Sequence, residues 1–354
     1  MSAMRWGNES TIDLGDTVTN TLEALTVPLI QAPMAGGPSN AALAVAVPQA
    51  GGLGMLAAGY KTVEAMAAEI DAVRAGTLTF GVNLFVPESD PSDPQALAAY
   101  AAALAPMAAE LGIAAPEPGP FNDDHYAPKL DYLVANPVPL VSFTFGLPTA
   151  DDVARLRSVG TEIVLNATDP EEISAADALD PDAIVVQGTE AGGHRATHGQ
   201  AKEPAAYDTH ELVSLAREYT DKPLIAAGGV TSGDIAQNHF DAGASAVQVG
   251  TLFLTADEAG TKEAQKDALL SGQYRDTVVT RAFSGRAARA LSNRFTERMA
   301  ADQVAGYPQV HYMTAPLRAA SADNPEGLNL WAGTGFAACQ QRPAAEIVDI
   351  FRSL

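Results

Sequence analysis

A histidine that directly follows two glycines is the residue of this sequence best suited to acid–base chemistry. It is His194, in the segment QGTEAGGHR at 187–195. An imidazole can accept or donate a proton near neutral pH, and the glycines let a flat ligand approach closely. We therefore expect His194 to be catalytic, with Arg195 beside it as a cation. The other histidines, at 125, 198, 210, 239 and 311, are expected to be structural or solvent-exposed, with the role of His311 left open.

Two glycine-containing turns could bind a phosphate group. In GGVTSGD, at 228–234, hydroxyl and acidic residues able to cap a helix follow the glycines, and QVGT follows at 248–251. Backbone N–H groups at such turns bind an anion without any Lys or Arg, because a helix dipole adds to their partial charge. A role in turn formation alone is the alternative. We expect the phosphate at Gly228, Gly229, Gln248, Val249, Gly250 and Thr251.

Two carboxamide residues, Asn83 and Gln187, lie at or near the ends of apolar runs. A carboxamide both donates and accepts hydrogen bonds, which suits the edge of a heterocycle such as a flavin. Lining the polar interior of a barrel explains each of them equally well. We expect no metal site, because HExxH, CxxC and HxH patterns are absent and His194 and His198 fall in a glycine-flanked loop. No paired carboxylates follow the runs, which disfavours a glycosidase.

The elements that position these residues alternate between apolar runs and Ala-rich amphipathic segments. Fully apolar strands are typical of a parallel sheet buried on both faces. Eight such units over about 255 residues predict an α/β fold, a (β/α)₈ TIM barrel, with a doubly wound open sheet as the alternative. A barrel of this kind places its ligand at the C-terminal ends of the strands. The expected strands are 27–32, 53–58, 79–85, 139–145, 162–166, 183–187, 223–227 and 246–253, and helices are expected at 40–50, 62–74, 94–111, 150–159, 170–179, 209–219 and 232–242.

Two stretches exceed a minimal barrel. We expect residues 1–255 to form the barrel domain, with an insertion at about 86–138. Residues 256–354 are expected to form an added helical region that covers the barrel mouth, from an acidic helical start at 256–270 to a final amphipathic helix at 344–352. Loops as long as these are commonly functional lids or small subdomains.

Composition excludes several classes of protein. The 354 residues are 47% hydrophobic and carry a formal net charge of −22, so a large core is available, while nucleic acids and anionic membranes would be repelled. The first 16 residues contain no signal segment, and no apolar run is long enough for a membrane span. The single cysteine, Cys339, excludes an intrachain disulfide and is expected to be a packed or surface thiol. We expect a soluble cytoplasmic protein, monomeric or homodimeric.

Several motifs together resemble the nitronate monooxygenase family. They are QAPMAGG (31–37), GVNLF (81–85), SFTFGLP (142–148), QGTEAGGHR (187–195), AAGGV (226–230) and QVGTLFL (248–254), with SGRAARALSNRF (284–295) and YPQVHYMTAPLR (307–318) in the C-terminal part. The resemblance covers about residues 28–331. It implies an FMN-dependent TIM barrel that oxidises alkyl nitronates, such as propionate 3-nitronate, with O₂ to a carbonyl compound and nitrite. Detoxification of a nitro compound is the role that it suggests.

The resemblance also implies roles for individual residues. Pro33 and Met34 would lie against the flavin, and His194 would be a catalytic base or a substrate-orienting group. With Arg195, His194 would supply positive charge for the nitronate. Thr144 departs from the family, because some members have a histidine there. The implied flavin contacts are Asn83, Gln187, Gly192 and Gly193, the implied phosphate contacts are Gly229, Gln248, Gly250 and Thr251, and Tyr307, His311 and Tyr312 would line the substrate mouth.

Other functions remain as alternatives. Flavin-dependent enoyl-acyl-carrier-protein reductases and NADH:quinone reductases are similar in fold and share a GGH-type motif, although SFTFGLP and NLWAG look more like the oxygenase branch. A barrel dehydrogenase acting on IMP or a similar nucleotide is disfavoured, because Cys339 lies far outside the barrel loops. A non-catalytic flavin or phosphate-binding module is the third alternative.

Overall fold

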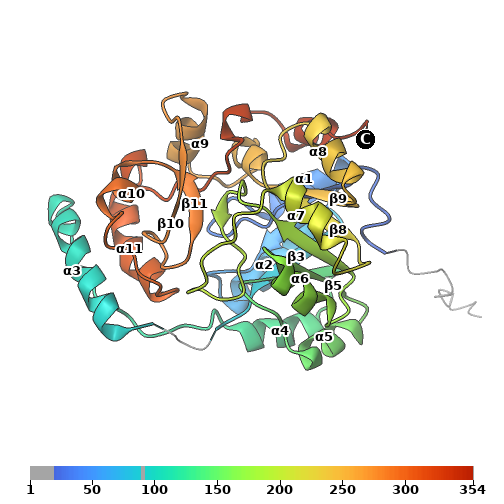
Figure 1. The fold of residues 1–354 in the computed structure, drawn as a ribbon, viewed down its shortest axis with the longest axis horizontal. Helices are drawn as coiled ribbons and strands as arrows, with labels where there is room; N and C mark the ends of the chain where they lie inside the picture. Colours follow the sequence, from blue (N-terminus) through green and yellow to red (C-terminus); the bar gives the residue numbers. More distant parts are fainter. Residues whose placement is uncertain (1–19, 89–91, 354) are drawn as a thin grey trace, which may run out of the picture.

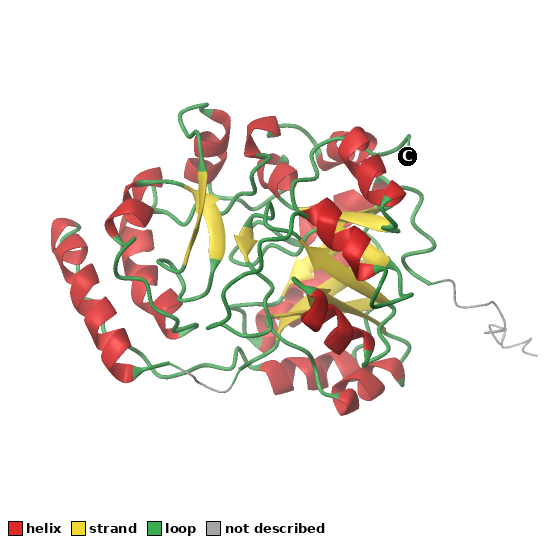
Figure 2. Ribbon diagram, viewed as in Figure 1, coloured by secondary structure: helices red, strands yellow, loops and turns green. Residues whose placement is uncertain are grey.

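Eight parallel strands wrap around a common axis and form a barrel (Figures 1 and 2). The computed structural model describes residues 20–88 and 92–353. Each strand pairs with the next one along the chain, and the last pairs with the first, with Leu29 opposite Val247. A parallel bridge between Ile30 and Leu53 joins the first two strands, which confirms the barrel rather than an open sheet. The strands are β1 (Leu29–Gln31), β2 (Gly54–Ala57), β3 (Phe80–Phe85), β4 (Leu140–Thr144), β5 (Glu162–Ala167), β6 (Ala183–Gln187), β8 (Leu224–Ala227) and β9 (Ala246–Val249).

Both faces of these strands are covered, which explains their continuous apolar sequences. In β6, Ile184 and Val186 belong to the large core between strands and helices. The alternate residues, Ala183 and Val185, belong to a smaller cluster built only from strand residues and their immediate neighbours. Since successive strand side chains point to opposite faces, this smaller cluster fills the barrel interior.

Helices surround the barrel, and all of them except α4 (Tyr126–Ala135) begin at a residue whose side chain caps the helix (Figure 2). Thr62, for example, accepts a hydrogen bond from the backbone of Ala65, and Ser232 accepts one from that of Ile235. Such caps satisfy N–H groups that have no partner within the helix. The helices are α1 (Ala41–Gln49), α2 (Val63–Arg74), α5 (Ala150–Arg157), α6 (Pro170–Asp177), α7 (Thr209–Ala216) and α8 (Gly233–Asp241), with α3 (Pro94–Glu110) and α4 (Tyr126–Ala135) between β3 and β4.

The sequence predicts a purely helical C-terminal region, but the structure also contains strands there. β10 (Thr277–Thr280) and β11 (Ala288–Leu291) pair antiparallel, and β11 also pairs with β7 (Gly193–His194) from the barrel loop. The eighth barrel strand is shorter than predicted, because the chain turns at Thr251–Thr255 into a 3₁₀ helix, η1. The remaining helices are α9 (Glu263–Leu270), α10 (Arg294–Arg298), α11 (Gln309–Ala320) and α12 (Ala344–Asp349).

Part of the insertion packs with this C-terminal region rather than with the barrel. Figure 1 shows α3 beside α11, and their apolar residues share one core that includes Leu104, Phe283 and Val310. The C-terminal helix α12 returns to the barrel and packs against α1. None of the helices in the described ranges is long and apolar enough to cross a membrane. The first 16 residues, in which we expect no signal segment, lie outside the described residues.

Candidate active site

A cavity of about 250 Å³ opens at the C-terminal ends of the barrel strands. The strand ends contribute Ala32, Asn166 and Ala227 to its lining, and the C-terminal region contributes Trp331. Most residues singled out from the sequence meet here, although they are spread over more than 250 positions of the chain. They are Pro33, Met34, Asn83, Thr144, Gln187, Gly192, Gly193, His194, Gly228, Gly229, Gln248, Val249, Gly250, Thr251 and His311.

His194 is held from two sides. Its strand β7 pairs with β11, with His194 opposite Ala288, and its ring Nε2 lies 2.8 Å from the Ser284 hydroxyl. The ring also contacts Phe145 at the end of β4, with centroids 5.4 Å apart, and Trp331, at 5.3 Å. The barrel and the C-terminal region therefore fix the imidazole together.

Burial keeps His194 neutral. Removal from water, together with the nearby charges of Arg286 and Arg318, lowers the pKa of the imidazole to about 3. At neutral pH the ring therefore offers one hydrogen-bond donor and one acceptor. This contradicts the expectation that His194 itself supplies positive charge to an anionic substrate.

Arg195 does not line the cavity, so the expectation that it faces the substrate is wrong. Its buried guanidinium donates hydrogen bonds to the backbone carbonyls of Gln187 and Gly188. The physical reason is the pairing of His194 and Arg195 with β11 and the residue before it, since successive side chains of a paired strand point to opposite sides. Because His194 faces the cavity, Arg195 faces away and ties the loop to the end of β6.

Two tyrosines expected at the substrate mouth also lie outside the cavity lining. Tyr312 is 40% exposed, because it follows His311 on α11 and successive helical residues point about 100° apart. Tyr307 lines a smaller neighbouring cavity with Arg286 and Glu88. It approaches His194 through its ring, with centroids 6.0 Å apart.

The two carboxamides have different environments. Oδ1 of Asn83 accepts hydrogen bonds from the hydroxyls of Ser142, at 2.8 Å, and Thr144, at 2.9 Å. This fixes the amide orientation and leaves its NH₂ group as the donor available to a ligand. In contrast, Gln187 accepts from the Ala196 backbone at 3.0 Å and donates to the His194 carbonyl at 3.2 Å. Gln187 therefore braces the loop that carries His194.

The glycine turns after β8 and β9 form an anion cradle. Gly228 and Gly229 have φ angles of +124° and +69°, a region that favours glycine. The N–H groups of Gly229, Gly250 and Thr251 make no hydrogen bond to any other described residue. Ser232 caps the N-terminus of α8 immediately beyond the first turn. These unpaired donors beside a helix N-terminus have the chemistry that a phosphate group requires.

The sequence reasoning missed the cations of this site. Lys262 and Arg318 both line the cavity, whereas none of its described lining residues is Asp or Glu. Arg318 donates to the carbonyl of His311 at 2.9 Å and forms no ion pair within the described ranges. The motif YPQVHYMTAPLR contains Arg318, but nothing in its spacing shows that this side chain reaches the barrel.

The sequence also gave no prediction of the aromatic pair in the cavity wall, Tyr60 and His311. The ring of Tyr60, just after β2, stacks on that of His311, with centroids 4.0 Å apart and planes 3° apart. The sequence signal was present, because the second apolar run ends in AAGY. The tyrosine at that strand end could have been chosen on the same ground as Asn83.

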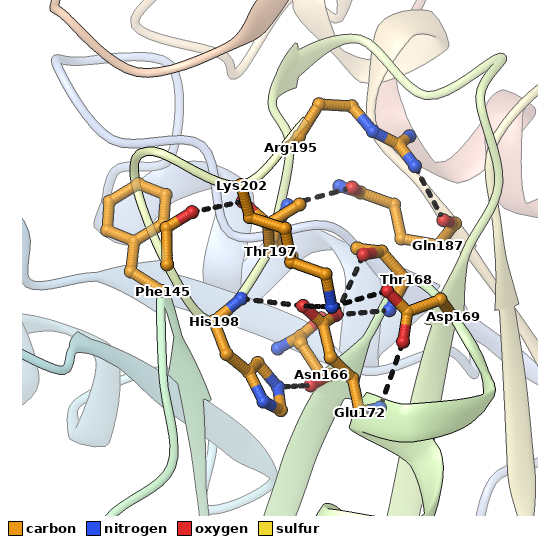
Figure 3. A network of polar contacts seen from close by, with 12 residues as sticks. Phe145, Asn166, Thr168, Asp169, Glu172, Gln187, Arg195, Thr197, His198 and Lys202 are labelled. Carbon is orange, nitrogen blue, oxygen red and sulfur yellow. Dashed lines mark hydrogen bonds and ion pairs between the residues drawn. The ribbon is translucent and has the colours of Figure 1, made fainter. Parts of the chain in front are cut away.

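A partly buried ionic cluster anchors the loop that follows His194. Figure 3 shows Lys202 between the carboxylates of Asp169 and Glu172, with Nζ 2.9 Å from Glu172 Oε1. Glu172 also accepts from the His198 backbone, and the His198 ring lies 2.7 Å from the Asn166 carbonyl. His198 is thus structural, as predicted. Within residues 20–88 and 92–353, no cluster of three potential metal ligands occurs.

Comparisons with known proteins agree with one another. A family model described as nitronate monooxygenase matches residues 19–351. A probable nitronate monooxygenase of Staphylococcus aureus (strain Newman) is 33% identical over 332 residues, which are 92% of this chain and 93% of the relative. The solved structure of nitroalkane oxidase from Streptomyces ansochromogenes has a TM-score of 0.90 at 41% identity, covering 95% of this chain and 97% of that one. FabK from Thermotoga maritima, at 23% identity and a TM-score of 0.73 over 95% of this chain and 94% of that one, shares the fold.

Proposed function

The chain belongs to the nitronate monooxygenase family of flavin-dependent oxidoreductases, and on that basis we propose that it uses FMN and O₂ to oxidise alkyl nitronates to a carbonyl compound and nitrite. One observation carries the proposal beyond family membership. The cavity lining combines an anion cradle at the ends of β8 and β9 with two cationic side chains, Lys262 and Arg318, and its described residues include no carboxylate. Such a cavity suits a phosphate-bearing cofactor together with an anionic substrate.

The residues present fit FMN. The N–H groups of Gly229, Gly250 and Thr251 would bind its phosphate, since they have no other partner among the described residues. Met34 would lie against the ring system, and the oriented NH₂ group of Asn83 would donate to its polar edge. When bound, FMN supplies the electron-accepting ring and the reaction with O₂.

The protein's part is binding and orientation. A nitronate is already an anion, so no proton has to be removed from carbon before oxidation. The neutral His194, oriented by Ser284, would donate or accept a hydrogen bond at the nitronate group. Phe145 and Trp331 flank the imidazole and keep water away from it.

The experiment compares a nitronate with a nicotinamide as reductant. The purified protein, reconstituted with FMN, is expected to be yellow, to lose its flavin absorbance with propionate 3-nitronate in the absence of O₂, and to release nitrite in air. A protein that cannot take up FMN would contradict the flavin assignment. A bound flavin bleached by NADH but indifferent to the nitronate would instead favour the reductase alternative.

Substitution of the histidine tests its role. His194→Asn is expected to retain FMN and to lose turnover by about 10²–10⁴-fold, the usual contribution of a positioned acid–base side chain. His210→Asn is the matched control, because His210 is exposed on α7 and lies outside the cavity lining. Equal turnover in the two variants would remove His194 from the reaction.

A further inference from the structure

Arg318 presents an uncompensated charge to the cavity. Its side chain lines the cavity, yet no carboxylate within the described ranges pairs with it. One terminal nitrogen donates to the His311 carbonyl at 2.9 Å, while Nε is buried without a hydrogen-bond partner. A half-buried guanidinium whose Nε is removed from water without a partner is costly unless a ligand supplies the missing acceptor.

The position of this guanidinium is fixed by a chain of contacts. His311, which Arg318 touches, stacks on Tyr60. The backbone N–H of Tyr60 donates to Asp124 at 2.8 Å, and Asp124 pairs with the fully buried Lys129 at 2.7 Å. These contacts hold Arg318 before any ligand binds, so little side-chain entropy is lost on binding.

The groups that face Arg318 do not cancel its charge. His311 is neutral, since burial and the adjacent Arg318 lower the pKa of its imidazole to about 2. Tyr60 is also neutral, because burial raises the pKa of its hydroxyl. The charge of Asp124 is already matched by Lys129. The positive potential at this end of the cavity is therefore available to a ligand.

Arg318 and His194 occupy different parts of the cavity wall. Arg318 is on α11 and contacts His311, whereas His194 is on β7 and contacts Ser284. Because both side chains line the same cavity, one substrate can contact His194 with one polar group and Arg318 with another.

We propose that Arg318 determines substrate specificity by binding a carboxylate at the end of the substrate remote from the nitronate. The planar guanidinium can donate two parallel hydrogen bonds to a carboxylate, which a lysine cannot do. The enzyme then selects nitronates with a second anionic group over simple alkyl nitronates. This inference rests on the proposed function, because it assigns the other end of the same substrate.

Kinetics with two nitronates test the proposal. In Arg318→Gln, kcat/KM for propionate 3-nitronate is expected to fall about 10–100-fold, mainly through KM, because a hydrogen bond to a charged group is lost. For ethyl nitronate, which lacks the carboxylate, it is expected to change less than threefold. Arg318→Lys should lie between wild type and Arg318→Gln. Arg298→Gln, a surface variant on α10 with the same change of net charge, is the control.

Binding without turnover separates this proposal from the proposed function. The probes are 3-nitropropionate and the uncharged 1-nitropropane, titrated calorimetrically against the FMN-loaded protein at pH 6. Arg318→Gln should raise the Kd of 3-nitropropionate at least tenfold and leave that of 1-nitropropane unchanged.

Each outcome has one meaning. An equal effect of Arg318→Gln on both probes, or on neither, overturns the role of Arg318. If the wild-type protein oxidises neither nitronate but prefers 3-nitropropionate through Arg318, the proposed function fails while the carboxylate site stands. Thermal unfolding of each variant confirms that it is folded.

Discussion

Nε2 of His194 lies 2.8 Å from the hydroxyl of Ser284, and this contact joins the loop after β6 to the loop between β10 and β11. The Ser284 hydroxyl also lies 3.2 Å from the Arg286 carbonyl and accepts from the Arg286 N–H at 3.3 Å. A hydroxyl has a single proton to donate. Its choice between the carbonyl and the imidazole therefore sets the tautomer of His194.

Ser284→Ala is expected to lower kcat for nitronate oxidation about 3–10-fold, because one hydrogen bond contributes about 0.5–1.5 kcal/mol. FMN content should not change. Ser214→Ala, which removes an exposed hydroxyl on α7, serves as the control. A double variant with His194→Asn should lose no more than His194→Asn alone, and additive losses would show that Ser284 does not act through the histidine.

Thr144→Val is expected to weaken FMN binding about 3–10-fold. The hydroxyl of Thr144 donates to Asn83 Oδ1 at 2.9 Å, so its loss leaves only Ser142 to hold the amide. Thr144→Ser keeps the donor and should bind FMN as the wild type does. Fluorescence titration of the apoprotein with FMN measures this, and equal affinity of all three proteins would refute the role given to Thr144.

Gly192→Ala is expected to reduce the free energy of unfolding by ~1–3 kcal/mol, as overpacking generally does. A Cβ at this position would lie 2.3 Å from the backbone nitrogen of Gly333 and 2.5 Å from the carbonyl carbon of Ala332. Gly119→Ala is the control, since a Cβ there meets nothing within 4 Å. Urea unfolding of both variants measures the free energy of unfolding. An unchanged value for Gly192→Ala would contradict the close approach of Gly192 to Ala332 and Gly333.

The stability of the protein should fall as the pH decreases from 8 to 5. Burial lowers the pKa of His194 to about 3 and that of His311 to about 2 in the folded protein. The unfolded chain binds protons at these residues below about pH 6.5, whereas the folded protein does not, so acid favours unfolding. Each histidine should account for about 2 kcal/mol over this range.

His311→Phe tests this pH dependence, because it preserves a ring against Tyr60 and removes one titrating group. Its free energy of unfolding should decrease by about 2 kcal/mol less than that of the wild type between pH 8 and pH 5. Urea unfolding at several pH values provides the measurement. Parallel curves for the two proteins would show that His311 is not held neutral.

The barrel was predictable because its signals are local. A run such as PLIAAGG is apolar on both faces and ends in glycine, so it indicates a buried parallel strand and the turn after it. The residues at the C-terminal ends of the strands can then be predicted to form the site, since all of these ends lie at the same face of the barrel. On this ground Asn83, His194 and Gly229 were found, and the cavity contains all three.

The composition of this acidic chain does not show how its site could bind an anionic ligand. A net charge of −22 describes the whole protein, whereas a ligand responds to the groups around it. The cavity lining contains Lys262 and Arg318 and, among the described residues, no carboxylate. The excess negative charge therefore lies outside the site.

By itself, the sequence determined the order of the barrel elements, the glycine turns and the histidine, because each depends on residues near one another in the chain. Only the tertiary structure decided which arginine faces the cavity. Arg195 adjoins His194 but points away, since an extended backbone alternates its side chains. Arg318, more than 120 positions later, reaches the cavity because the C-terminal part of the chain brings α11 to the cavity wall, and such long-range packing leaves no local pattern in the sequence.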